Sequence, residues 1–180
     1  MDVIEIKTGD ERIFKVGVRD LLGAPVDAIV NPANSGLSHG AGLASIISDE
    51  AGPEMDAECE KIIGKVGQIP TTYVVPTTAG NLPFKGIIHG VGPRMGGGDE
   101  QQRIEATIAN VLKVADKKDW TSVAFPAIST GIFGIPKEVC AAAFKIAVPT
   151  YWEINPASTI TLVWLCLTGD DFPAFREVLA

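Results

Sequence analysis

Residues 28 to 42 read Ala28-Ile29-Val30-Asn31-Pro32-Ala33-Asn34-Ser35-Gly36-Leu37-Ser38-His39-Gly40-Ala41-Gly42, a short apolar run followed by a polar, glycine-containing loop. The apolar run predicts a strand over Ala28–Asn31 that is covered on both faces. A helical pattern begins where the loop ends, at about Gly42. Amides at the start of a helix bind phosphate without a basic side chain, and the asparagines can hydrogen-bond sugar hydroxyls. This segment predicts an α/β fold with an anion site at the edge of its sheet.

A second loop of the same kind follows the strand predicted over Ser122–Pro126 and precedes a helix. It reads Pro126-Ala127-Ile128-Ser129-Thr130-Gly131-Ile132-Phe133-Gly134. Its hydroxyl groups and backbone amides suit a diphosphate, and its phenylalanine offers an apolar wall for a ribose. In open α/β sheets, ligands bind outside the carboxyl ends of the strands. We therefore expect the two loops to face each other and to enclose an elongated, dinucleotide-like ligand.

The remaining elements fit one α/β domain over residues 1–180. Short β-branched runs alternate with longer helical patterns, and no linker, repeat or low-complexity tract divides the chain. The first two strands follow each other without a helix, so the sheet is expected to be mixed. Further strands are predicted over Val3–Lys7, Arg12–Val16, Thr72–Pro76, Gly86–Val91 and Thr159–Leu167. Helices are predicted over Gly42–Glu50, Pro53–Ile63, Glu100–Lys117, Pro136–Val148 and Asp171–Leu179.

The composition narrows the class of protein. Apolar residues make up 46% of the chain, and the net charge of −7 works against non-specific binding of nucleic acid. The scattered cysteines, Cys59, Cys140 and Cys166, and the two histidines, His39 and His89, have no metal-ligand spacing, so neither a metal site nor a disulfide is predicted. Neither a signal peptide nor a membrane-spanning stretch is recognisable, which favours a soluble, cytoplasmic protein.

Common nucleotide-binding motifs fit the chain less well. The run Gly40-Ala41-Gly42-Leu43-Ala44-Ser45 lacks the third glycine of a dinucleotide fingerprint and begins about nine residues past its strand. A P-loop requires Gly-Lys followed by Ser or Thr, and this combination does not occur.

Taken together, these segments resemble the macrodomain family. The likeness rests on Val30-Asn31-Pro32-Ala33-Asn34 with His39-Gly40-Ala41-Gly42, on Gly90-Val91-Gly92-Pro93 and on Ser129-Thr130-Gly131-Ile132-Phe133-Gly134. It covers essentially the whole chain. It implies a three-layer α/β/α sandwich with a mixed, mostly parallel central sheet, a cleft for ADP-ribose and no cofactor.

The resemblance also implies roles for individual residues. Asp20, placed before the first loop, corresponds to an acidic residue that accepts a hydrogen bond from the adenine amino group, and Leu21 presents a backbone amide to adenine. Asn34 falls at the position that contacts the distal ribose, and Leu167 takes the place of an aromatic residue beside adenine. The loops around the diphosphate and distal ribose correspond to Gly40, Ala41, Gly42 and Leu43 and to Ser129, Thr130, Gly131, Ile132 and Phe133, with Asn31 as a further ligand contact.

Two departures bear on activity. Ala41 replaces a usual glycine, and its methyl group is expected to narrow the backbone approach or to demand a particular dihedral. Ala44 stands where one hydrolytic branch carries an aspartate, and the surrounding pattern instead resembles viral macrodomains and those joined to certain ADP-ribosyltransferases. That group includes hydrolases without the aspartate. We therefore predict hydrolysis of mono-ADP-ribose from acidic side chains, with Asn34, His39 and Phe133 as catalytic residues.

Two alternatives stay open at this point. One is a reader that binds ADP-ribose without turning it over, and the other is a deacetylase of O-acetyl-ADP-ribose. All three functions use the same cleft, because their ligands share the portion that fills it. The expected partners are ADP-ribose and a mono-ADP-ribosylated protein, bound by a monomer.

Overall fold

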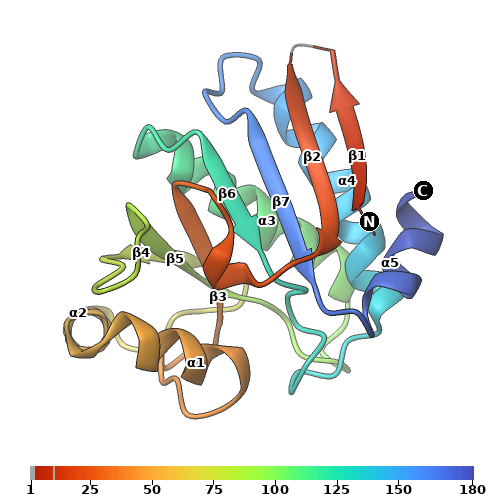
Figure 1. Cartoon of the computed structure of the whole chain (residues 1–180). Helices are drawn as coiled ribbons and strands as arrows, with labels where there is room; N and C mark the ends of the chain where they lie inside the picture. The colour runs from red at the N-terminus through yellow and green to blue at the C-terminus, as the bar shows by residue number, and fades with distance from the viewer. Residues whose placement is uncertain (1–2, 10) are drawn as a thin grey trace.

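A seven-stranded mixed sheet forms the centre of the computed structural model, which describes residues 3–9 and 11–180 (Figure 1). The strands are β1 (Val3–Thr8), β2 (Arg12–Val18), β3 (Ala28–Ala33), β4 (Val74–Thr77), β5 (Gly86–Val91), β6 (Ser122–Phe125) and β7 (Leu162–Leu167). The helices are α1 (Gly42–Ala51), α2 (Pro53–Val66), α3 (Glu100–Lys117), α4 (Lys137–Ile154) and α5 (Phe172–Leu179), with a short 3-10 helix η1 (Leu21–Gly23). The order across the sheet is β1-β2-β7-β6-β3-β5-β4.

The middle of the sheet is parallel and its two edges are antiparallel. Strands β2, β7, β6, β3 and β5 pair in parallel, whereas β1 and β4 run antiparallel to β2 and β5. The expected mixed, mostly parallel sheet is therefore confirmed. Because parallel strands end at the same edge, the loops that follow the five central strands gather there.

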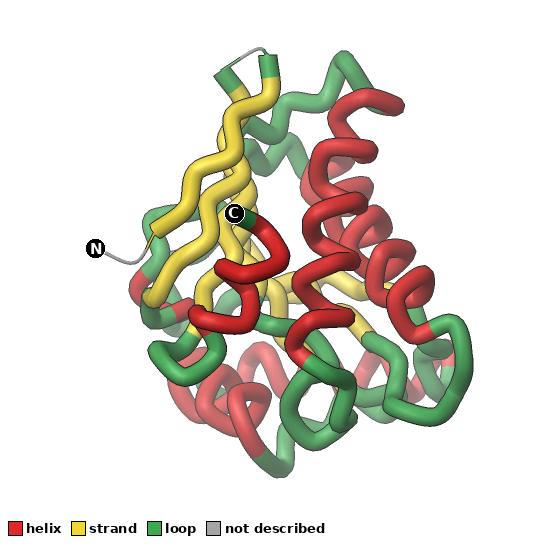
Figure 2. Tube along the Cα trace, turned by 90° about the vertical axis from the view of Figure 1, so that its right-hand side faces the viewer, coloured by secondary structure: helices red, strands yellow, loops and turns green. Residues whose placement is uncertain are grey.

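Helices cover both faces of the sheet. On one face α3, α4 and α5 pack over a core that contains Phe14, Phe125 and Phe144. On the other face α1 and α2 pack over a second core around Ile47 and Met55. In the side view of Figure 2, the strands lie to one side of the long helices. The three-layer α/β/α sandwich expected from the sequence is confirmed.

Helix α4 differs from its predicted end at Val148, because it continues through Pro149 to Ile154. A proline removes one backbone hydrogen bond from a helix interior, and sequence reasoning therefore ended the helix before it. Tertiary contacts hold the last turn. Tyr151 donates its hydroxyl to Asp116, and the indole of Trp152 donates to the carbonyl of Ile160 at 3.0 Å.

Two strands begin later than predicted. Strand β7 begins at Leu162, because the preceding Thr159 donates its backbone amide to the carboxylate of Asp116 at 3.1 Å and is not available for the sheet. Strand β4 begins at Val74, because Thr72 adopts a φ of 78°, which no strand residue can have. Among the described residues, no helix combines the length and the apolar character needed to cross a bilayer.

The connection after β4 anchors the carboxyl end of α1 through Gly80. This residue has a φ of 58°, and a Cβ atom there would collide with the carbonyl oxygen of Ala51, the last residue of α1. We expect Gly80→Ala to lower the free energy of unfolding by at least about 2 kcal/mol. Chemical denaturation followed by tryptophan fluorescence measures this change.

Gly64→Ala is the matched control. Gly64 lies in α2 with open space around it and no strained φ. The free energy of unfolding of the Gly64→Ala variant should rise by about 0.5–1 kcal/mol, because alanine has a higher helix propensity than glycine. Equal stability of the two variants would show that the close approach at Gly80 is unimportant.

Candidate functional site

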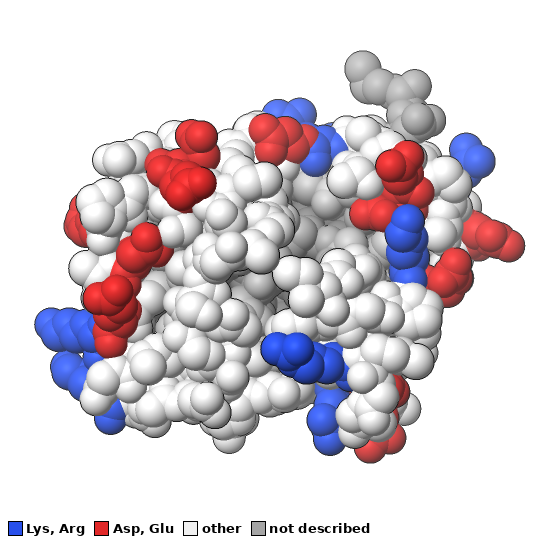
Figure 3. All heavy atoms as spheres, turned by 90° about the horizontal axis from the view of Figure 1, so that it is seen from below, with Lys and Arg blue, Asp and Glu red and all other residues white. Residues whose placement is uncertain are grey.

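A cleft of about 580 Å³ lies at the carboxyl edge of the parallel strands. Its walls are the loops that follow β2, β3, β5, β6 and β7. Figure 3 shows this face of the molecule hollowed near its middle. The predicted site residues that line it are Asp20, Leu21, Asn34, Gly40, Ala41, Gly42, Leu43, Ser129, Thr130, Gly131, Ile132, Phe133 and Leu167.

The first wall is the amino terminus of α1. The N-cap residue is Ala41, no side chain caps the first turn, and no acidic residue lies in that turn. Because the first amides of a helix have no partner inside the helix, they present donors and a positive dipole end to the cleft. Gly42 has a φ of 61°, a conformation that glycine adopts without strain. Ala41 has a φ of −153°, so of the two effects expected from its methyl group, the demand for an unusual dihedral does not occur.

The second wall is the loop after β6. Ser129 is buried with a φ of 66°, which is strained for a residue other than glycine. A hydrogen bond of 3.0 Å from the amide of Gly134 to the carbonyl of Gly131 closes the turn. Within the described part of the chain, the amides of Gly131, Ile132 and Phe133 donate to no protein acceptor. This wall therefore offers a second row of backbone donors to the cleft.

Asn34 lines the cleft and also braces its own loop. Its amide nitrogen donates to the backbone carbonyl of Ser38 at 2.8 Å, and its side-chain oxygen accepts from the backbone amide of Ser38 at 3.0 Å. The amide group is thus held in one orientation by Ser38. A fixed orientation favours recognition of a sugar hydroxyl.

The far end of the cleft is apolar with one carboxylate. Asp20 accepts a hydrogen bond from the amide of Leu22 at 3.1 Å, which fixes the carboxylate at the start of η1. Leu21, Cys166 and Leu167 are buried and complete this end. Burial raises the pKa of the Cys166 thiol to about 12, so the thiol stays protonated and acts as an apolar surface. Leu167, which the resemblance places where an aromatic residue is usual, offers apolar contact here.

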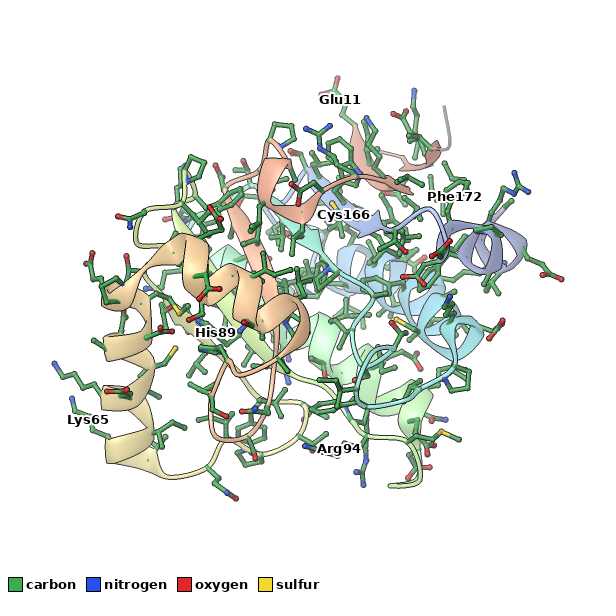
Figure 4. The ribbon with its side chains drawn as sticks, turned by 60° about the horizontal axis from the view of Figure 1, so that its bottom comes forward. Glu11, Lys65, His89, Arg94, Cys166 and Phe172 are labelled. Atoms are coloured by element: carbon green, nitrogen blue, oxygen red, sulfur yellow. The ribbon has the colours of Figure 1, made fainter. Side chains whose placement is uncertain are left out.

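The cleft contains residues that sequence reasoning missed. They include Arg19, Ser38, Arg94, Cys166, Thr168 and Asp171. Most of them lie just past the carboxyl end of a parallel strand, which is the signal that could have found them. Figure 4 shows Cys166, from β7, and Arg94, from the loop after β5, at opposite ends of the cleft.

The structure does not bring Asn31 and His39 to the cleft, although both were predicted there. Asn31 is fully buried, because it alternates along β3 onto the face covered by α1 and α2. Its register partner on β5 is His89, and its amide nitrogen lies 2.9 Å from Nδ1 of His89 and 3.3 Å from Nδ1 of His39. Nε2 of His89 lies 2.8 Å from the hydroxyl of Thr77. These residues form a network that fixes the first loop to the sheet.

The same network brings together three potential metal ligands that the sequence left apart. Ligand atoms of His39, Cys59 and His89 lie within 4.8 Å of one another. The two rings stack, with centroids 5.4 Å apart and planes at 26°, and the amide of Asn31 donates to Nδ1 of both. Figure 4 shows His89 beneath α1, away from Arg94 and Cys166. The hydrogen bonds identify His89 as a hydrogen-bonded residue of the core.

Burial disfavours the charged form of both rings. Desolvation lowers the pKa of His39, against a smaller opposing effect of Asp56. Desolvation and the neighbouring His39 lower the pKa of His89 from 6.5 to about 3. Both histidines are therefore neutral at physiological pH, which suits rings that accept hydrogen bonds from one amide.

These pKa shifts predict a loss of stability in mild acid. The pKa of His89 is lower in the folded chain than in the unfolded chain. Between these two pKa values the unfolded chain binds a proton that the folded chain does not bind, so acid favours unfolding. The free energy of unfolding should be highest above about pH 6.5. Below that pH it should fall by up to about 1.4 kcal/mol per pH unit. Urea denaturation between pH 7.5 and 5 measures the slope.

His89→Gln supplies the comparison for this measurement. Glutamine keeps hydrogen-bonding capacity but does not titrate, so the variant should show a shallower slope over the same pH range. An unchanged slope would mean that other groups set the acid sensitivity.

Comparisons with known proteins agree with this geometry. The model of the Macro domain family matches residues 30–144. An O-acetyl-ADP-ribose deacetylase of Escherichia fergusonii is 45% identical over 133 residues, which are 73% of each chain. A macro domain-containing protein of Listeria monocytogenes is 42% identical over 163 residues, or 89% of this chain and 93% of the relative. A mutant of the Oceanobacillus iheyensis macrodomain solved with ADPR has a TM-score of 0.88 and 27% identity, covering 98% of this chain and 96% of the other. The chain belongs to the macro domain family.

Proposed function

We propose that the cleft binds ADP-ribose and that the protein hydrolyses the ester between the distal ribose and an acidic side chain of a mono-ADP-ribosylated protein. One observation carries the proposal. Two rows of unpaired backbone amides, at the start of α1 and in the loop after β6, line the same cleft. A diphosphate between them would receive hydrogen bonds from both sides.

The rest of the cleft fits the remaining parts of ADP-ribose. Asp20 and the apolar end around Leu21 and Leu167 suit adenine, whose amino group needs one acceptor and whose ring needs apolar contact. Asn34 and Phe133 suit the distal ribose. The macrodomain of Oceanobacillus iheyensis was solved with ADPR and with ADP, which supports this class of ligand.

The chemistry proposed for hydrolysis relies on positioning rather than on a strong base. The carboxylates that line the described cleft are those of Asp20, which caps η1, and Asp171, which pairs with Lys137 at 2.8 Å. Ala44 lines the cleft without a titratable group. A water ordered by Asn34 and by loop amides would attack C1″ of the distal ribose. The bond from C1″ to the ester oxygen would break, the side-chain carboxylate would leave, and the proton of the water would pass to solvent. Orientation and preorganised donors can lower such a barrier by several kcal/mol.

In this mechanism His39 serves as a positioning residue. Its ring lies behind the cleft wall and stacks on His89, while its backbone belongs to the loop that leads into α1. It therefore helps to hold the loop amides in place and does not touch the substrate. Phe133 lines the cleft and would contact the ribose.

A second candidate function is deacetylation of O-acetyl-ADP-ribose. The relatives of Escherichia fergusonii and Klebsiella pneumoniae, 45% and 37% identical, carry the name O-acetyl-ADP-ribose deacetylase. This substrate shares the diphosphate, the adenine and an ester on the distal ribose, so the same groups would serve. A reader without turnover is the third possibility, favoured by the absence of a carboxylate at Ala44.

The decisive experiment measures release of ADP-ribose from a protein mono-ADP-ribosylated on glutamate or aspartate, with Gly131→Glu as the test variant. A Cβ atom at Gly131 meets nothing within 4 Å, and its φ is not positive, so the variant should fold. The new carboxylate would repel the diphosphate, and we expect at least about a hundred-fold loss of ADP-ribose affinity by calorimetry.

Gly131→Gln is the matched control, since it has the same size without the charge. Turnover by the wild type and none by Gly131→Glu would support hydrolysis in this cleft. Binding without turnover of either ester would instead make the protein a reader. Unchanged affinity in Gly131→Glu would show that the diphosphate lies elsewhere.

Asn34→Ala separates catalysis from binding. We expect kcat to fall about a hundred-fold, because one preorganised group near the reacting centre is lost. The affinity for ADP-ribose should fall much less. Single-turnover assays and calorimetry measure the two effects separately.

Ser38→Ala tests one part of this bracing, because it removes the Ser38 hydroxyl to which the amide nitrogen of Asn34 donates at 3.0 Å. The substitution removes only the hydroxyl and leaves both backbone contacts. A loss of kcat as large as that of Asn34→Ala, or equal losses of turnover and affinity in Asn34→Ala, would refute a direct catalytic role.

A further inference from the structure

Arg94 occupies a defined place at the mouth of the cleft. It follows β5 in a loop that packs tightly on the second wall, since a Cβ atom on Gly92 would collide with the hydroxyl of Ser129. The amide of Met95 donates to the carbonyl of Phe133 at 2.8 Å, which ties the two loops together. The guanidinium carbon of Arg94 lies 4.3 Å from the centroid of the Phe133 ring. Figure 4 shows Arg94 at the end of the cleft opposite Cys166.

The guanidinium of Arg94 has hydrogen-bonding capacity that the described residues do not use. It makes no ion pair and donates to no protein acceptor among them. The other arginine of the cleft, Arg19, donates to the carbonyl of Gly23 at 2.6 Å and lies over the ring of Trp164. Arg94 is exposed, and among the described residues its N–H groups have no hydrogen-bond acceptor. A guanidinium that lies over an aromatic ring can still donate its N–H groups to a carboxylate.

The place of Arg94 relative to the ligand decides what it can contact. Phe133 stands at the end where the proposed function puts the distal ribose, and the modified protein must leave the cleft at that end. Ile132 and Met95, 75% and 58% exposed, flank the mouth and offer apolar contact to a polypeptide. The chain as a whole carries a net charge of −7, which repels acidic polypeptides. Arg94 is thus a local positive charge on a chain of negative net charge, and an acidic polypeptide segment could bind beside it.

We infer that Arg94 is a specificity-determining residue, which selects substrates whose polypeptide carries further carboxylates beside the modified side chain. This inference rests on the proposed function. It names an acidic segment of the modified protein as the group recognised. It also predicts that O-acetyl-ADP-ribose, which has no such segment, gains nothing from Arg94.

Two peptides test the inference. Each carries one mono-ADP-ribosylated glutamate, with aspartates on both sides in the first and asparagines at the same positions in the second. The wild type should favour the first peptide in kcat/KM by about two- to five-fold, the range that one exposed ion pair supplies. The preference should shrink in high salt, because exposed charges are screened. A merely structural role of Arg94 would show neither preference nor salt dependence.

Variants assign the preference to the guanidinium. Arg94→Gln should bring the ratio between the peptides close to one, and Arg94→Lys should keep part of it. Arg103→Gln is the matched control, because Arg103 is an exposed arginine near the same loop that does not line the cleft, and it should keep the ratio.

The outcomes separate the inference from the function on which it rests. If the wild type cleaves neither peptide, hydrolysis fails, but direct binding of the intact peptides still measures the preference. Equal treatment of both peptides by the wild type, or a preference that survives in Arg94→Gln, overturns the inference. A loss of affinity for free ADP-ribose in Arg94→Gln as large as the loss for the acidic peptide also overturns it, because the guanidinium would then contact the diphosphate.

Discussion

The uncapped amino terminus of α1 is the constraint on which the rest of the structure depends. Its first amides have no side-chain partner, and leaving them free costs stability that a capping residue would supply. The surroundings hold the helix in spite of this. Its carboxyl end receives the amide of Asn81 on the carbonyl of Ala51 at 2.8 Å, and the loop before it is fixed by the network around Asn31. The donors thus stay aimed at the cleft and available to a ligand.

Backbone dipoles, rather than basic side chains, form the proposed diphosphate site. This explains how a chain with a net charge of −7 can hold an anion. In this arrangement the backbone amides would bind the diphosphate, and the charged side chains of the cleft would not be needed for it. The two arginines of the cleft then differ in use, because Arg19 is bound to its own protein and Arg94 stands at the mouth.

The proposed reaction follows from what the cleft holds and from what stands at Ala44. With one carboxylate capping η1 and the other in an ion pair, the groups left for water are amides and hydroxyls. Such groups orient a nucleophile but do not deprotonate it strongly. An ester with a good leaving group suits this chemistry better than a more stable linkage, which is why the proposed substrates are acyl esters of ADP-ribose.

The sequence by itself determined the elements and the two main loops. Apolar runs bounded by turn residues predicted β5 and α3 at their observed bounds, because local propensity and periodicity act within a few residues. The loop residues predicted to bind the diphosphate line the cleft, because a strand-loop-helix unit places its loop at the carboxyl edge.

Only the tertiary structure decided the direction of individual side chains and the partners of distant segments. The side chain of Asn31 lies in the core, because it alternates onto the face of the sheet where His89 of the neighbouring strand lies. The half-buried ring of His39 follows it, since Nδ1 of His39 lies 3.3 Å from the Asn31 amide nitrogen. Helix α4 passes Pro149 because Tyr151 and Trp152 find partners far along the chain. Arg94 and Cys166 reach the cleft only because β5 and β7 run parallel to β3. Strand parity and strand order arise from long-range pairing, and local sequence patterns do not contain that information.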